Sequence, residues 1–273
     1  MASARRSGRR VALFWIAYLV VTVGAGMLKG MAPPALQALA WGSASSAVML
    51  LVSLAFLRRE GRTPAEIGIR PVPGSLARFA VGAVVGVALF LLYIGIAIAA
   101  GPVRLVPSPG GGGAGIALAV ATYVSLSCME ELGYRGYPLR TLAPAFGIWP
   151  AQLIVATAFA LNHLAFGWSW TSVLLGVVAG SILFGMAALA SGGLALPIGL
   201  HAAWNLVSWA VGEKGEPGLW SVAVADAERG RAAATGSAGY VAVMLLGTAG
   251  CWWWHRRTGG ATPAAADGWR ERA

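Results

Sequence analysis

Long apolar runs recur along this chain and restrict what it can fold into. Runs long enough to cross a hydrocarbon core of about 30 Å lie near residues 11–30, 36–57, 79–100, 115–135, 150–166, 169–190, 194–212 and 237–254. Only 11% of the 273 residues are charged, against about 25% in soluble proteins. Backbone polar groups inside a bilayer must be satisfied within the chain, which favours helices. The sequence therefore predicts an all-α, polytopic transmembrane helical bundle with about eight spans.

The basic residues lie mostly beside the apolar runs. The net charge is +10, which in a soluble protein would suggest binding to nucleic acid. In a membrane protein, Lys and Arg instead concentrate in the cytoplasmic segments. With a cytoplasmic N-terminus, the outer segments hold only a few of the 20 Lys and Arg residues, namely Lys29, Arg104, Lys214, Arg229 and Arg231. We therefore expect a multi-pass protein of the cell membrane, in contact with the lipid bilayer, with both termini cytoplasmic and no nucleic-acid partner.

Composition divides the chain into three parts. Residues 1–114 are predicted to form the first three transmembrane helices, with a cytoplasmic loop over 58–78 that is rich in Pro, Gly and charge. Residues 115–212 hold the apolar runs in which strongly polar side chains concentrate. Residues 213–273 comprise a polar outer loop, the last transmembrane helix and a tail that is expected to be disordered because it lacks an apolar period.

Two adjacent carboxylates, Glu130 and Glu131, lie at the end of the run 115–135. An ionisable side chain at bilayer depth costs about 2.5 to 3.5 kcal/mol on insertion scales, so this pair is expected to mark a functional site. Arg135 follows Glu131 by four residues, which places these two side chains one helical turn apart. Glu130 points about 100° away from Glu131. Arg135 is therefore predicted to hold Glu131 as a structural anion while Glu130 faces a cavity.

Further polar side chains inside the apolar runs include His163, His201 and Asn205. His201 and Asn205 are four residues apart and share a helix face. Taken alone, each of these side chains is explained by hydrogen bonding between helices, and the pair Glu131 and Arg135 by a solvated ion pair. Their coincidence in one chain favours a single site.

In chain order, three patterns resemble the motifs of the CPBP intramembrane proteases, also called the Abi or type II CAAX prenyl endopeptidase family. They are Glu130-Glu131-x-x-x-Arg135, Phe159-x-x-x-His163 and His201-x-x-x-Asn205. The resemblance covers about residues 115–210. It implies that residues 115–212 are the catalytic core of a glutamate-dependent endopeptidase, a hydrolase with its site inside the bilayer. The implied substrate is a membrane-associated peptide or protein of CAAX or bacteriocin-like type.

The resemblance also implies a role for each residue. Glu130 is the implied general base that activates water, and His163 holds or polarises that water. His201 and Asn205 are the implied pair that stabilises the tetrahedral oxyanion. A base that works near neutral pH needs a raised carboxylate pKa, which burial and a neighbouring carboxylate both favour.

Glu131 and Arg135 are implied to be supporting residues, although Glu131 is also a candidate for part of the acid–base work. A divalent metal such as zinc is left open, because two histidines and one or two glutamates could form a zinc site and the family is often labelled metalloprotease. The chain contains no His-Glu-x-x-His. We therefore assign no cofactor and no metal ligands.

Two functions other than proteolysis stay open. In a non-enzymatic immunity or scaffolding protein of the same fold, the polar set would only tie helices together. In a proton-coupled transporter, buried Glu and His would form a proton relay, although the chain shows no repeated half with paired broken helices. The sequence identifies neither the substrate nor whether it is prenylated.

The depths of Glu130 and His163 in the bilayer set one further expectation. Eight simple spans would put Glu130 near the cytoplasmic end of its helix and His163 near the outer end of another. Either the first helix continues past Arg135 toward Leu142, or the helix over 150–166 is short, tilted or re-entrant. We expect the first, because only Pro138 in the extension disfavours helix.

Overall fold

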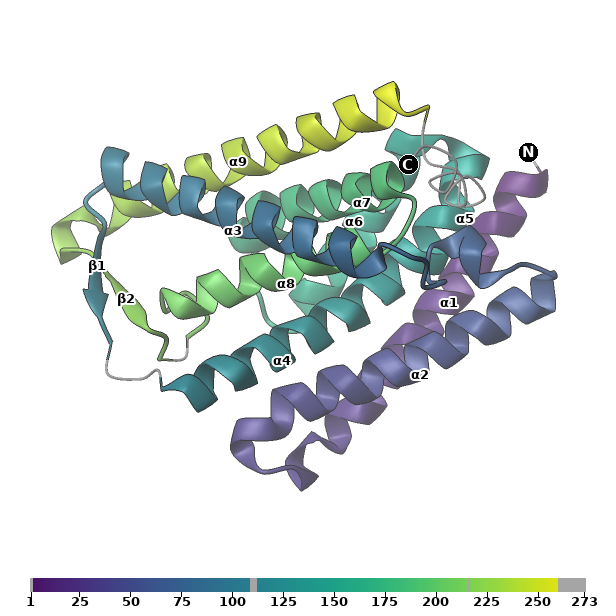
Figure 1. Cartoon of the computed structure of the whole chain (residues 1–273), viewed down its shortest axis with the longest axis horizontal. Coiled ribbons are helices and arrows are strands. Elements are labelled where there is room, and N and C mark those ends of the chain that lie inside the picture. Colours follow the sequence, from purple (N-terminus) through teal and green to yellow (C-terminus); the bar gives the residue numbers. More distant parts are fainter. Residues whose placement is uncertain (1, 109–111, 216, 260–273) are drawn as a thin grey trace.

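The computed structural model describes residues 2–108, 112–215 and 217–259. The helices are α1 (Ala2–Met27), α2 (Gln37–Glu60), α3 (Ser75–Ala100), α4 (Gly113–Glu131), α5 (Tyr137–Phe146), α6 (Ile148–Ala165), α7 (Val178–Ser191), α8 (Ala195–Ala210) and α9 (Arg229–Arg257). Strands β1 (Arg104–Pro107) and β2 (Trp220–Ala223) pair antiparallel at one end of the bundle, and α1 begins and α9 ends toward the other (Figure 1). The tail predicted over 258–273 lies outside the described residues, apart from Thr258 and Gly259.

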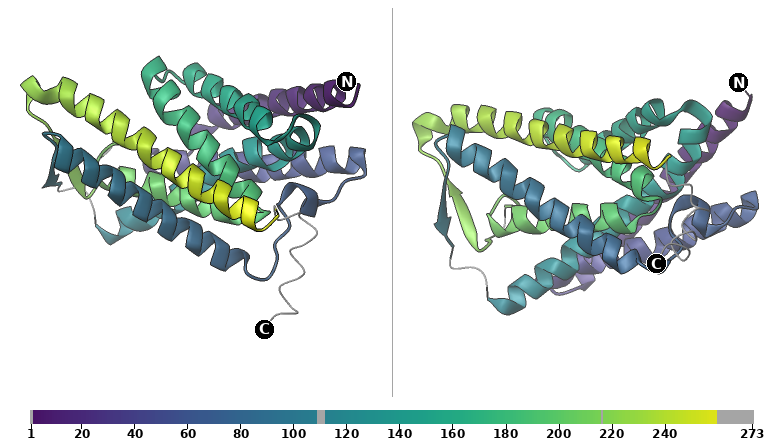
Figure 2. Two further views of the ribbon diagram at one scale, coloured as in Figure 1. Left: turned by 90° about the horizontal axis from the view of Figure 1, so that it is seen from above. Right: turned by 45° about the horizontal axis from the view of Figure 1, so that its top comes forward.

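Short helical segments join these elements. Two have π-helical geometry, η4 (Leu132–Gly136) before α5 and η5 (Ser172–Val177) before α7. The others are 3-10 turns, namely η1 (Lys29–Met31), η2 (Pro34–Leu36), η3 (Pro64–Ile67) and η6 (Asp226–Glu228). Figure 2 shows the same helices from two further directions, with α3 and α9 side by side in both views.

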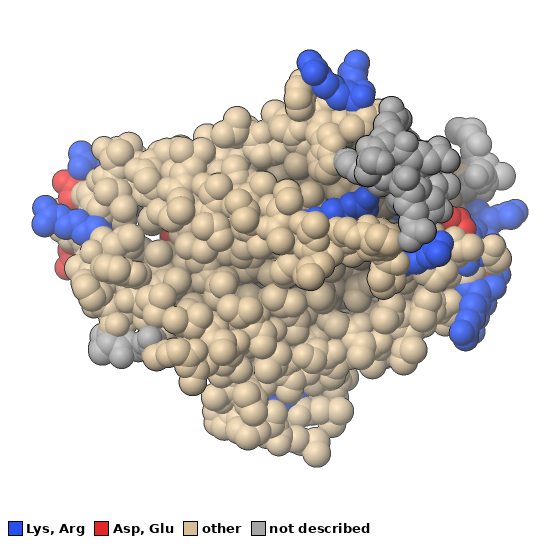
Figure 3. All heavy atoms as spheres, in the orientation of Figure 1, with Lys and Arg blue, Asp and Glu red and all other residues tan. Residues whose placement is uncertain are grey.

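Seven helical segments of the described chain are long and apolar enough to cross a membrane. They are Ala4–Met31, Pro34–Glu60, Ser75–Ala100, Gly113–Phe146, Ile148–Ala165, Ser172–Ser191 and Asp226–Arg257. The remaining predicted run forms α8, which has 16 residues and buries most of its first three turns. On the face drawn in Figure 3, charged side chains gather mainly at the two ends, with a broad uncharged surface between them. The prediction of an all-α, polytopic membrane bundle is confirmed.

The helix that carries the glutamates continues well past Arg135. Together, α4, η4 and α5 form one helical segment of 34 residues. Pro138 is tolerated because it lies in the first turn of α5, where the missing backbone N–H costs no hydrogen bond within the helix. The π-turn of η4 precedes it. This confirms the expectation that the helix extends to Leu142.

The position of α8 depends on glycines. A Cβ atom at Gly82 of α3 would overlap the carbonyl group of Leu196 in α8, and one at Gly199 of α8 would overlap that of Phe79 in α3. Small residues that allow backbones to approach closely are the usual means by which membrane helices pack. Helix α8 also contacts α4 and α7, so it lies in the interior of the bundle (Figure 1).

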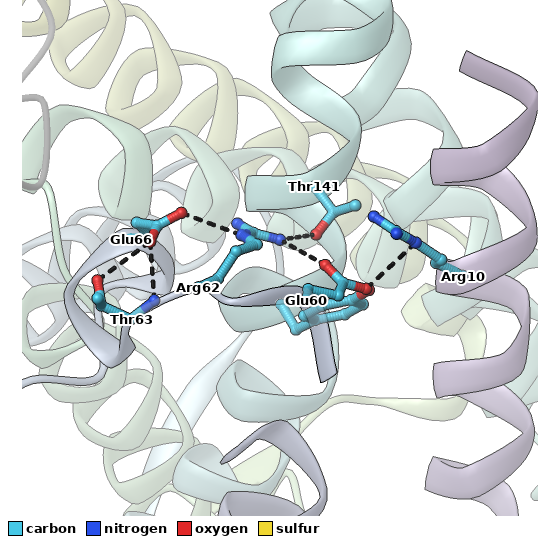
Figure 4. Close-up of polar contacts among 7 residues, drawn as sticks. Arg10, Glu60, Arg62, Thr63, Glu66 and Thr141 are labelled. Atoms are coloured by element: carbon cyan, nitrogen blue, oxygen red, sulfur yellow. Dashed lines mark hydrogen bonds and ion pairs between the residues drawn. The ribbon is translucent and has the colours of Figure 1, made fainter. Parts of the chain in front are cut away.

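At the end of the bundle where α1 begins, Glu60 joins several elements (Figure 4). Its carboxylate lies 3.4 Å from Nε of Arg10 in α1 and 3.5 Å from Nη1 of Arg62. Arg62 also donates hydrogen bonds to Oγ1 of Thr141 in α5 at 2.9 Å and to Oε2 of Glu66 in η3 at 3.1 Å. The side chain of Glu60 is only 7% exposed. This network therefore ties α1, α2, η3 and α5 together.

The segment over 213–236, predicted as a polar outer loop, contains β2, η6 and the first turns of α9. Helix α9 begins at Arg229, where Arg229 and Arg231 pair with Asp226 and Glu228 at 2.7 and 3.0 Å. Hydropathy could not detect these turns because they are polar. The two short strands were likewise not predicted.

Candidate active site

Side chains from all three sequence motifs line one cavity of about 660 Å³. Glu130 comes from α4, His163 from α6, and His201 and Asn205 from α8. The close packing of α8 within the bundle brings its His201 against the end of α4, while α6 contributes His163 to the lining of the cavity. The structure thus brings together four of the six predicted site residues, and their catalytic roles stay predictions.

The remaining two, Glu131 and Arg135, form a buried ion pair beside the cavity. Both side chains are 0% exposed, and Nη1 of Arg135 lies 3.3 Å from Oε1 of Glu131. The guanidinium lies 4.4 Å from the ring centroid of Phe159 and donates to the carbonyl oxygen of Ser181 at 3.4 Å. A buried charge needs a partner of opposite charge, and Arg135 supplies it. Arg135 thereby links α4 and η4 to α6 and α7.

His201 lies between the two carboxylates. Its Nδ1 is 3.0 Å from Oε1 of Glu131 and its Nε2 is 3.5 Å from Oε2 of Glu130. The ring stacks on Phe184 with 4.2 Å between centroids. Because Glu131 is paired with Arg135, its carboxylate accepts a hydrogen bond, so we assign the Nδ1 proton of His201 to that contact.

This assignment has a consequence for the second contact. A neutral imidazole that donates from Nδ1 carries a lone pair on Nε2, which would face the lone pairs of an ionised Glu130. A proton on either Nε2 of His201 or the carboxyl group of Glu130 removes that repulsion. The structure therefore places Nε2 of His201 beside the carboxyl group of Glu130, a contact that motif spacing did not predict.

His163 presents one ring nitrogen to the cavity. Its Nδ1 donates to the carbonyl oxygen of Phe159, one turn earlier in α6, at 2.9 Å. In the neutral ring this leaves Nε2 as an acceptor. The ring also contacts Phe159 and Trp168 edge-on, with centroids 4.4 and 5.0 Å away. The imidazole is therefore held in one orientation by aromatic side chains and by a backbone hydrogen bond.

Sequence reasoning missed several polar residues that line the cavity near Asn205. Nζ of Lys214 donates to Oδ1 of Asn205 at 2.6 Å. Next to it, Glu213 accepts hydrogen bonds from the hydroxyl groups of Tyr93 at 3.0 Å and Ser208 at 3.1 Å. From sequence alone Lys214 is only a basic residue of an outer loop, because no local spacing relates it to α8.

Burial raises the pKa of Glu213, while its hydrogen bonds from Tyr93 and Ser208 act in the opposite direction. Burial also lowers the pKa of Lys214, against the attraction of Glu130 and Glu213. Glu213 is exposed and Lys214 half-buried by accessible area, and both line the cavity. Both side chains therefore form part of a cavity lining that is partly polar and partly apolar.

Within the described residues, no group of three or more His, Cys, Asp or Glu side chains is arranged to hold a metal ion. The two glutamates and His201 lie close together, but Oε1 of Glu131 is already engaged by Nδ1 of His201 and by Nη1 of Arg135. The donor set in this arrangement does not match the three-ligand pattern of a catalytic zinc site. No step of the reaction is therefore assigned to a metal.

A bundle of apolar helices that encloses acid, imidazole and amide side chains in one cavity defines a polytopic membrane protein with a polar site inside the bundle. Residues 112–207 match the family model described as type II CAAX prenyl endopeptidase Rce1-like. This segment contains all six predicted site residues. The match confirms the resemblance to the CPBP proteases over this segment of the chain. No curated protein and no solved structure matched the chain.

Proposed function

We propose that this protein is an intramembrane endopeptidase that hydrolyses a peptide bond of a membrane-associated peptide or protein, with Glu130 as the base. The single observation that carries the proposal is the cavity shared by Glu130, His163, His201 and Asn205. Its lining also includes Trp168, Trp204 and Tyr240 among its aromatic side chains. A mixed apolar and polar lining suits a membrane-associated peptide, because it can contact apolar side chains and also hydrogen-bond the backbone amide groups.

In the first step Glu130 removes a proton from water, and the oxygen of that water attacks the carbonyl carbon of the scissile bond. Nε2 of His163 accepts a hydrogen bond from the second O–H of the water and so orients it, while that hydrogen stays on the oxygen. The new C–O bond converts the carbonyl oxygen into an oxyanion, which the side-chain amide of Asn205 stabilises by donation. Glu131 and Arg135 take no proton and hold His201 in place.

In the second step the C–N bond breaks and the carbonyl group re-forms. The leaving nitrogen takes the proton held by Glu130. One product has a new amine terminus and the other a new carboxyl terminus. Glu130 returns to its starting state, so a single carboxylate serves as base and then as acid.

Purified protein in liposomes is expected to cleave members of a peptide library carrying apolar membrane-anchoring segments. A His163→Gln variant should retain the fold and lose about 10²-fold in kcat, because only the water-orienting acceptor is altered.

Cleavage that survives a metal chelator supports direct activation of water by Glu130. Loss of cleavage on chelation, restored by added zinc, would instead assign a metal to the reaction. Absence of cleavage by the wild-type protein, with intact structure, would favour an immunity or scaffolding role.

We also propose that both termini are cytoplasmic, as the distribution of Lys and Arg suggests. Trp168 and Lys214, which line the cavity, then lie in loops at the outer side of the bilayer, and the substrate approaches from that side. Fluorescent protein fused to the C-terminus should fold and fluoresce in cells, whereas alkaline phosphatase at the same position should be inactive. Active phosphatase fusions would reverse the orientation.

A further inference from the structure

Lys214 stands out among the residues that line the cavity because, in the part of the chain that the structure describes, no other Lys or Arg side chain lines it. Lys214 lies in the loop that follows α8, nine residues after Asn205. The 2.6 Å contact between Nζ of Lys214 and Oδ1 of Asn205 is short for a nitrogen donor. A family motif does not account for this contact, since Lys214 lies beyond residues 112–207.

The loop is built to return Lys214 to Asn205. The backbone N–H of Glu213 donates to the carbonyl oxygen of Ser208 at 2.9 Å. The backbone N–H of Gly212 donates to the carbonyl oxygen of Trp209, also at 2.9 Å. Gly212 adopts φ +81°, a left-handed conformation that favours glycine. The Glu213 side chain is held in addition by the hydroxyl group of Ser208. These contacts fold the chain back over the last turn of α8.

The contact decides which end of the Asn205 amide serves the cavity. The Lys214 side chain donates hydrogen bonds whether it is charged or neutral. The Asn205 amide atom next to Nζ of Lys214 is therefore the acceptor Oδ1. The planar amide then directs its two N–H donors away from Lys214. The two ends of an asparagine amide have almost the same shape, so without Lys214 the amide could turn over. Its oxygen would then face the cavity and repel a developing oxyanion.

We propose that Lys214 is a positioning residue that fixes the side-chain amide of Asn205 with its N–H donors directed into the cavity. Its effect on cleavage rests on the proposed function, whereas the contact itself does not. Lys214 acts through Asn205 and does not touch the scissile bond.

The orientation can be measured without any assay of activity. The chain contains only two asparagines, Asn162 and Asn205, and only two lysines, Lys29 and Lys214. Protein labelled with ¹⁵N-asparagine and embedded in lipid nanodiscs should show two pairs of side-chain amide signals, which an Asn205→Asp variant assigns. Lys214→Met should shift the Asn205 pair and leave the Asn162 pair in place. The matched control Lys29→Met, which removes an ammonium group 5.9 Å from the Trp41 ring centroid, should move neither pair. An Asn205 pair unchanged by Lys214→Met would overturn the proposal.

A double-mutant cycle tests the consequence for cleavage. Lys214→Met should lower kcat about 10- to 100-fold with KM changed less than about twofold, because a misplaced donor costs transition-state stabilisation rather than binding. Lys214→Arg, which keeps a cationic donor, should recover part of that loss. Combined with Asn205→Ala, Lys214→Met should cause no further loss, since its target is gone. Effects that multiply in the double variant would overturn the proposal. If the wild-type protein cleaves nothing, the proposed function fails and the amide signals alone decide the orientation.

Discussion

A Glu130→Gln variant is expected to cleave its peptide about 10²- to 10⁴-fold more slowly than the wild-type protein, with KM nearly unchanged. Glutamine keeps the volume and hydrogen-bonding reach of the side chain but cannot take a proton from water. The substitution also replaces the carboxylate that lies 3.5 Å from Nε2 of His201 by an uncharged amide. Since the Glu130 side chain keeps 19% of its surface exposed, the change leaves no buried charge unpaired and should alter stability little.

Single-turnover cleavage in liposomes measures this effect, with thermal unfolding in detergent to verify the fold. Glu228→Gln is the matched control, because Glu228 pairs with Arg231 on the exposed first turn of α9 and should leave the rate unchanged. A Glu130→Gln variant that cleaves at the wild-type rate would end the assignment of Glu130 as the base. Proton flux that depends on Glu130, without cleavage, would favour a transporter.

Arg135→Met is expected to lower the free energy of unfolding by about 3 to 5 kcal/mol, since it leaves a buried carboxylate without its counter-charge. Glu131 is 0% exposed, so water cannot replace the guanidinium. The variant also loses the contact of the guanidinium with Phe159 and its hydrogen bond to Ser181. We expect the unfolding midpoint to fall by about 10 °C, and activity to fall with it because His201 loses a fixed partner.

The double variant Arg135→Met with Glu131→Gln separates charge from packing. It should recover a large part of the lost stability, because the unpaired charge is removed, but it should not recover cleavage. Arg231→Met, which alters a side chain that is 62% exposed, should leave the midpoint unchanged. An Arg135→Met variant as stable as the wild-type protein would show that the ion pair does not support the fold.

The sequence alone determined the features that depend on neighbours along the chain. Apolar length predicted the membrane-spanning helices, because the bilayer has a fixed thickness. The spacing of four residues predicted the contact of Glu131 with Arg135, now found at 3.3 Å, because helical geometry sets it locally. The separation of Glu130 from Glu131 onto different faces followed for the same reason.

Only the tertiary structure decided how residues on different helices meet. His201 contacts both carboxylates because of the way α3, α4 and α8 pack. Lys214 reaches Asn205 from beyond the end of α8 because the chain makes a left-handed turn at Gly212. Hydropathy cannot predict such contacts, because lipid and protein interiors are almost equally apolar. The depth and rotation of each helix instead follow from close packing at glycines such as Gly82.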